Sequence, residues 1–150
     1  MYIPDLTAYC YEESYIRAGL VAVGWLDQDH AFPRGDAPGE VRERLWKYLE
    51  RPIVQTRGWH PCPWCATTRA IRVRQGETEH LLGDAEIRVF SNTGEAYAAP
   101  NLVYHYIDTH QYLPPARFLN AVLTGPLPGT ATYETLIQGY TEYDEIDGWA

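Results

Sequence analysis

Apolar positions recur with two different periods along this chain, and the change of period marks the predicted elements. Residues 20–26 form a short, continuous apolar run, which is typical of a buried strand. Residues 71–74 and 86–89 alternate apolar with charged side chains, and turn sequences at 75–77 and 91–94 lead into the segments 78–82 and 95–98. The middle of the chain is therefore predicted to be an antiparallel meander of about three or four strands.

Helical spacing of apolar residues precedes and follows this meander. The stripe within 41–49 starts after Pro38 and ends before Pro52, and two further stripes lie within 102–110 and 118–123. A weaker helical pattern covers 133–138. The predicted fold is α+β, a small antiparallel β-meander packed with two or three helices. With 150 residues and no repeat or linker, we expect a single domain over 1–150.

Composition changes the picture of the core. The chain has 12 Tyr and 5 Trp but only 3 Phe and 1 Met. Tyrosine and tryptophan rings carry a polar group that needs a hydrogen-bond partner when the ring is buried. We therefore expect a core with polar atoms at its edges.

The charge distribution limits the possible partners. A net charge of −8 argues against nonspecific binding to nucleic acid or to an anionic membrane. The residues from 51 to 76 nevertheless include five arginines and no acid, while the chain after Arg117 has acids and no Lys or Arg. Either these regions are solvated faces that attract each other, or the arginines face an acidic partner. No run approaches the ~20 apolar residues of a membrane span, and no secretory signal is visible, so we expect a cytoplasmic protein.

The hexapeptide His60-Pro61-Cys62-Pro63-Trp64-Cys65 is the most informative motif. Two thiolates at Cys-x-x-Cys spacing can hold one tetrahedral zinc ion from a tight turn, and a structural zinc site needs four Cys or His ligands. Without a secretory signal, this pair indicates metal or redox chemistry rather than a disulfide. Zinc is the favoured interpretation; two ordinary thiols and a redox pair are the alternatives.

Histidines can supply the remaining ligands. His105 lies at the edge of the apolar face of its predicted helix and His110 at the centre, and the two point about 140° apart. We therefore expect them not to face one ion unless the helix frays. In treble-clef-like zinc sites, a knuckle that carries two ligands is followed by a β-hairpin and then by a helix with a ligand near its start. The predicted ligands are Cys62, Cys65 and His105 first, then His60, with His110 as a substitute.

Catalytic interpretations of the same residues are weaker. Zinc deaminases share Pro-Cys-x-x-Cys, but they also need an upstream His-x-Glu, which this sequence lacks. A thioredoxin-like redox site needs a βαβ unit around the cysteines and a helix N-terminus that stabilises the thiolate. Neither is evident in this sequence. A hydrolase-like metalloenzyme, in which three protein ligands leave a zinc position open for water, remains an alternative.

Several phrases of the chain resemble a family of small uncharacterised bacterial proteins that carry a His-x-Cys-Pro-x-Cys motif. They include 2–6, 23–27, 56–65 and 85–89, and a further phrase runs from Tyr97 through Ile107. The resemblance spans about the first 125 residues. It implies a bacterial cytosolic origin and supports a site at His-x-Cys-x-x-Cys, but it implies no activity.

The sequence thus predicts a zinc-binding interaction module rather than an enzyme. Tryptophan and arginine are common anchors of protein interfaces. The expected partner face consists of Trp59, Trp64, Arg57, Arg69, Arg72 and Arg74. A protein partner is favoured over nucleic acid because of the negative net charge, although a nucleic-acid-binding zinc domain remains an alternative.

Overall fold

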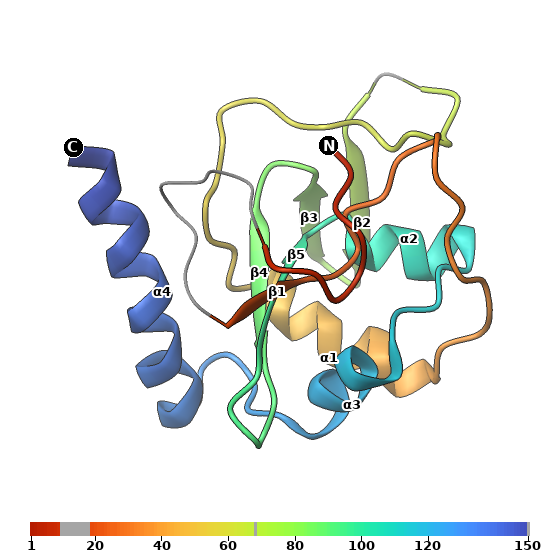
Figure 1. The fold of residues 1–150 in the computed structure, drawn as a ribbon. Coiled ribbons are helices and arrows are strands. Elements are labelled where there is room, and N and C mark those ends of the chain that lie inside the picture. The colour runs from red at the N-terminus through yellow and green to blue at the C-terminus, as the bar shows by residue number, and fades with distance from the viewer. Residues whose placement is uncertain (10–18, 68, 150) are drawn as a thin grey trace.

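A computed structural model describes residues 1–9, 19–67 and 69–149, with 141–149 described by their backbone alone. Four strands follow one another in the middle of the chain and three helices follow them, an α+β arrangement that confirms the predicted class (Figure 1). In chain order the elements are β1 (Leu20–Ala22), α1 (Gly39–Leu49), β2 (Ile71–Gln75), β3 (Thr78–Leu82), β4 (Glu86–Phe90), β5 (Ala96–Pro100), α2 (Val103–His110), α3 (Ala116–Thr124) and α4 (Ala131–Trp149).

The central sheet has three strands in the order β1-β5-β4. β5 pairs with β4 in antiparallel register and with β1 in parallel register, and every residue of β4 and β5 is buried. α1, α3 and α4 all pack against β4, while α2 and α4 lie on opposite sides of the sheet (Figure 1). The parallel pairing of β1 was not predicted, because it joins segments that lie far apart in the sequence.

The predicted meander is divided into two sheets. β2 and β3 form a separate antiparallel hairpin, and β4 and β5 belong to the central sheet. The break occurs at Gly83, whose φ of +99° favours glycine and whose N–H donates to the side chain of Asn101. A Cβ at Gly83 would lie 2.3 Å from the carbonyl oxygen of His60. The hairpin therefore ends where the chain passes against the loop that carries the cysteines.

Charged residues of β4 are buried rather than solvated. Arg88 and Glu86 are only 2% and 5% exposed, and their side chains form an ion pair at 2.8 Å. The Tyr9 hydroxyl donates to the other oxygen of Glu86. Because both faces of β4 are covered, the alternation of apolar and charged residues in this strand does not mark a solvent face.

The helices follow the predicted apolar stripes. The stripe of α1, which includes Val41 and Leu45, is buried, and α2 and α3 lie where the period predicted them. α4 starts after Thr130, whose hydroxyl accepts a hydrogen bond from the Tyr133 N–H and so caps the helix. It is much longer than the predicted segment 133–138, and it brings the helices of the described chain to four.

Several tyrosines of the core are buried together with their hydroxyl groups. Tyr48, Tyr112 and Tyr133 are fully buried. Their hydroxyls donate to the Pro126 carbonyl, to the Asp5 carboxylate and to the Arg88 carbonyl. These bonds satisfy polar groups that would otherwise be costly to bury.

Candidate metal centre

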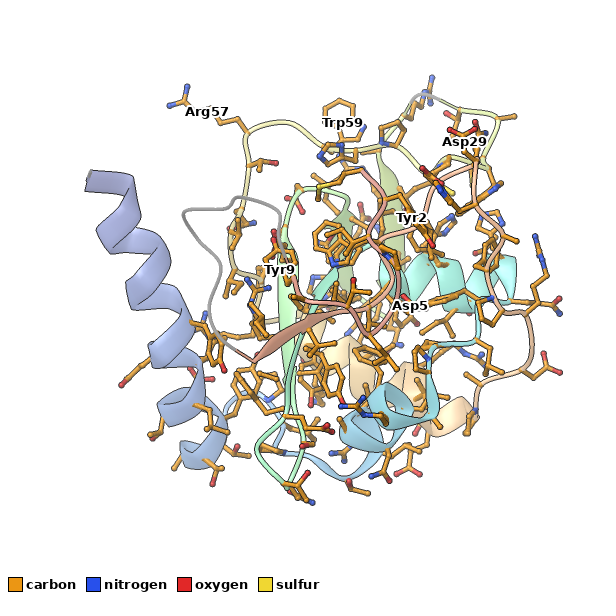
Figure 2. All side chains as sticks on the ribbon, viewed as in Figure 1. Tyr2, Asp5, Tyr9, Asp29, Arg57 and Trp59 are labelled. Atoms are coloured by element: carbon orange, nitrogen blue, oxygen red, sulfur yellow. The ribbon has the colours of Figure 1, made fainter. Side chains whose placement is uncertain are left out.

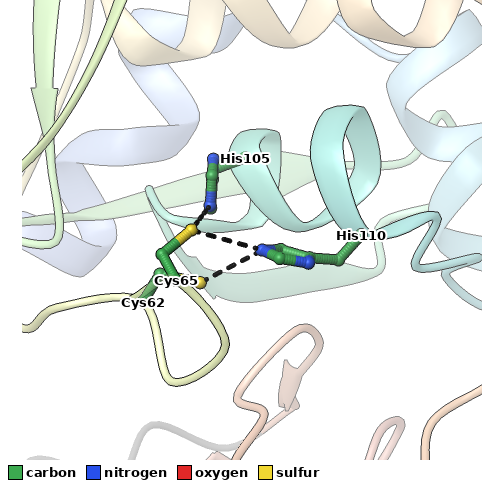
Figure 3. A group of neighbouring side chains, drawn as sticks. All are labelled: Cys62, Cys65, His105 and His110. Atoms are coloured by element: carbon green, nitrogen blue, oxygen red, sulfur yellow. Dashed lines mark hydrogen bonds between the residues drawn. The ribbon is translucent and has the colours of Figure 1, made fainter. Parts of the chain in front are cut away.

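Two cysteines and two histidines converge between the loop before β2 and helix α2. Cys62 and Cys65 come from the loop, and His105 and His110 come from the helix (Figure 3). One ligand atom from each side chain lies within 4.8 Å of the other three. Among the described residues this is the only group of three or more His, Cys, Asp or Glu side chains that can hold a metal ion.

The separations within this cluster match those around a tetrahedral ion. The Cys62 Sγ and the Cys65 Sγ lie 3.3 Å and 3.6 Å from the His110 Nε2, and the Cys65 Sγ lies 3.3 Å from the His105 Nε2. Tetrahedral zinc with ordinary Zn–S and Zn–N bond lengths would place S and N ligands about 3.6 Å apart. The four side chains are therefore arranged so that one ion can contact all of them.

His110, not His60, completes the cluster. The expectation that His105 and His110 could not face one ion is wrong here, because His110 is the last residue of α2. The next residue, Gln111, has left-handed backbone geometry that ends the helix, so the His110 ring is not confined between helical turns. His60 is exposed and lies outside the cluster, although its backbone N–H donates to the Gly83 carbonyl.

The loop that carries the cysteines is held by packing and by backbone hydrogen bonds. Cys62 is 3% exposed, and Trp64 packs its ring against Phe32, Tyr106 and His110 at centroid distances of 5.1, 5.5 and 5.6 Å. The Gln28 side chain donates to the Pro63 carbonyl. These contacts place both thiols against α2 before any ion binds.

The electrostatics of the cluster suit neutral imidazole ligands. Burial, with a contribution from His110, lowers the pKa of His105 to about 4. Burial, and then the charge of Arg34, lowers the pKa of His110. The His105 Nδ1 lies 3.3 Å from the Thr109 hydroxyl, which can orient the ring so that Nε2 faces the thiols.

Burial affects the Cys62 thiol in the opposite sense, because it disfavours the form that binds a metal. Burial raises the pKa of Cys62, which disfavours its thiolate. A bound metal ion reverses this preference because thiolate is the ligand form. A low-pKa redox cysteine needs an environment that stabilises the thiolate, and burial of Cys62 has the opposite effect.

The predicted partner residues are divided between the surface and the interior. Trp59 is 47% exposed, and Arg57 and Arg69 are exposed. Figure 2 shows Arg57 and Trp59 projecting from the loop that precedes the cysteines. Trp64 is half-buried beside His110, so the expectation that it is exposed is wrong.

Arg72 and Arg74 extend outward from β2, and both bond Glu79 on β3, at 3.2 and 2.7 Å. Glu79 thus pairs with both arginines across the hairpin, whereas Glu86 pairs with Arg88. The pairing with Glu79 leaves these two arginines less available to a partner. The arginine face on the surface thus centres on Arg57 and Arg69.

Comparison with protein families places most of the chain in one group. A model described as "Domain of unknown function (DUF7919)" matches residues 1–123. The chain belongs to this family. The matched region includes both cysteines and both histidines of the cluster, and it ends within α3.

Two further comparisons do not extend this family assignment. Searches of curated proteins and of solved structures gave no match to this DUF7919 protein. No helix in its described residues is long and apolar enough to cross a membrane.

Proposed function

We propose that this DUF7919 protein is a zinc-binding interaction domain whose ion is structural. The observation that carries the proposal is the convergence of Cys62, Cys65, His105 and His110 within 4.8 Å. Two thiolates and two imidazoles are a common ligand set for structural zinc, and zinc accepts both sulfur and nitrogen. The ion would join the cysteine loop to α2, two segments separated by both β-hairpins of the chain.

The number of ligands favours a structural ion over a catalytic one. Catalytic zinc sites keep a position open for water, whereas structural sites have four protein ligands. Four protein side chains surround one position here, and two of them, Cys62 and His105, are buried. Such a closed arrangement supports the interaction module over the hydrolase-like alternative.

The interaction role rests on the loop that the ion would fix. Trp59 is the largest exposed apolar side chain of the described residues, and exposed Arg57 lies two positions before it. An ion at Cys62 would anchor this loop and so reduce the entropy lost when a partner binds. We propose an acidic protein partner for this face because the net charge of −8 disfavours nucleic acid.

Metal analysis tests the zinc proposal directly. We expect about one zinc per chain in protein purified without chelators, and Cys62→Ser or Cys65→Ser should lose it. His60→Ala is the control, because His60 lies outside the cluster, and it should keep the metal. A protein that contains no metal under these conditions would contradict the proposal.

Chelation tests whether the ion is structural. Zinc binds the folded site far more strongly than the unfolded chain, so its binding energy contributes to folding and its removal should lower the melting temperature sharply. Differential scanning calorimetry before and after complete metal removal measures this shift. An unchanged melt would indicate a peripheral or catalytic ion instead.

Oligonucleotide binding tests the choice of partner class. Fluorescence anisotropy with random-sequence duplex and single-stranded DNA at physiological salt should show no tight binding. Tight binding that weakens steeply with salt would replace the protein partner with nucleic acid. Arg57→Ala with Arg69→Ala would then identify whether this face carries the contact.

A further inference from the structure

A cavity of about 490 Å³ lies beside the cysteine loop, at the end of the central sheet where the parallel strands β1 and β5 both terminate. Five separate segments of the chain contribute to its wall. The wall includes Trp25 after β1, Val54 after α1, Asp84 before β4 and Tyr106 on α2. Its volume falls within the range of about 300–1,000 Å³ that is typical of small-molecule sites.

Exposed apolar side chains gather at this cavity. Four large apolar residues are exposed in the described part of the chain, and two of them, Met1 and Val54, line the cavity. A third, Trp59, directly precedes the lining residue His60. Apolar surface that collects around one concave site, rather than being scattered, indicates a surface that a ligand covers.

The charged side chains of the wall are acidic. Asp27, Asp84 and Glu86 line the cavity, and no Lys or Arg among the described residues does. Both oxygens of Glu86 are engaged, one by Arg88 and the other by the Tyr9 hydroxyl. The charge of Glu86 is therefore compensated within the protein.

Asp84 differs because no cation of the described residues forms an ion pair with it. Its Oδ1 accepts a hydrogen bond of 3.1 Å from Asn101, whose own side-chain oxygen accepts the Gly83 N–H. This chain of bonds fixes the carboxylate in place. Trp25 and Tyr106 also line the cavity, and aromatic residues can attract cations.

We propose that this cavity binds a small organic cation, an amine attached to an apolar body, whose ammonium group pairs with Asp84. The apolar wall would cover the body of the ligand, and the uncompensated carboxylate would select for positive charge. The ligand is a free small molecule, because the cavity has the volume of a small-molecule site. The inference does not depend on zinc, since the lining residues are distinct from the four side chains of the metal cluster.

Three probes of nearly the same shape test the charge preference. Phenethylamine is cationic, 2-phenylethanol is neutral and 3-phenylpropionate is anionic at neutral pH. With about nine non-hydrogen atoms, the amine should bind with a Kd of about 1 mM or below. Binding is measured by titration while the indole N–H signal of Trp25 is followed by NMR. The amine should bind about tenfold more tightly than the alcohol, and the carboxylate should bind most weakly.

Asp84→Asn tests the named contact. Asparagine has the same shape and keeps an oxygen that can accept from Asn101, so the variant should fold with little loss of stability. It should lose the preference for the amine over the alcohol. Asp36→Asn is the matched control, because Asp36 is exposed and does not line the cavity, and it should keep the preference.

Three results would overturn the inference. One is the absence of amine binding to the wild-type protein at millimolar concentration, and another is equal affinity for all three probes. The third is an Asp84→Asn variant that keeps the wild-type preference. If Asp84→Asn fails to fold, the ranking of the probes on the wild-type protein decides the question alone. Binding of lysine-containing peptides without binding of the free amine would replace the small molecule by a peptide partner.

Discussion

Replacement of His110 by alanine, compared with replacement of His60, tests the proposed ligand set. The Nε2 of His110 lies 3.3 Å and 3.6 Å from the two thiols, whereas His60 is outside the cluster. His110→Ala should therefore weaken zinc binding, and His60→Ala should leave it unchanged. Both histidines lie close to the cysteines, so the pair controls for general disturbance of the loop.

The size of the effect follows from the number of ligands. A structural zinc site contributes roughly 10–16 kcal/mol, so one ligand of four accounts for about 2.5–4 kcal/mol, or a Kd change of about 60- to 700-fold. Because His110 is only half-buried, water can take its place on the ion. The loss should therefore lie at the lower end of this range.

Competition with a chromophoric chelator measures the zinc affinity of each variant. A melting curve in excess zinc shows whether each variant is folded. The reasoning would be refuted if His60→Ala lost affinity as much as His110→Ala did. It would also be refuted if His110→Ala bound zinc like the wild-type protein.

Three further predictions concern stability. Gly83→Ala should destabilise the protein more than Gly94→Ala, because both glycines have positive φ but only Gly83 would place its Cβ 2.3 Å from a backbone oxygen; urea unfolding compares them. Tyr133→Phe should lower the free energy of unfolding by about 1–2 kcal/mol, since it leaves a buried carbonyl of β4 without its 2.9 Å hydrogen bond; chemical denaturation measures the loss. A hydrogen bond from the Gly129 N–H, and then the Arg51 side chain, lower the pKa of Glu134 in the folded protein. Ionised Glu134 therefore stabilises the fold above the unfolded pKa of about 4.5, and this stabilisation is lost as the pH falls through the lower folded pKa. Glu134→Gln should therefore reduce the loss of melting temperature between pH 5 and pH 3, and an unchanged acid profile would contradict this assignment.

The local pattern of apolar residues was sufficient to predict the elements that a short segment specifies. The apolar stripes predicted α1, α2 and α3, because helical burial repeats every three to four residues and needs no knowledge of distant segments. Cys62 and Cys65 were predicted to be metal ligands for a similar reason, since two thiols three positions apart can meet on one ion within a single turn.

Contacts between distant segments determined the structural features that the apolar pattern did not predict. Arg88 alternates with apolar residues as a solvated side chain would, and only the layers packed on both faces of β4 show that it is buried with Glu86. No local signal marks the parallel pairing of β1 with β5 or the separation of β2 and β3 from the central sheet. These arrangements depend on which distant surfaces meet, and one sequence does not contain that information in its spacing.

The identity of the fourth residue of the metal cluster was likewise decided by the tertiary structure. Helical geometry predicted that His105 and His110 would diverge, and sequence proximity favoured His60. The tertiary structure brings His110 to the thiols because α2 ends at that residue and the cysteine loop packs against the helix end. The sequence alone determined that two thiols are poised to share an ion. Only the packing of the loop on α2 decided which histidines join them, because that choice depends on the position of two segments that are distant in the chain.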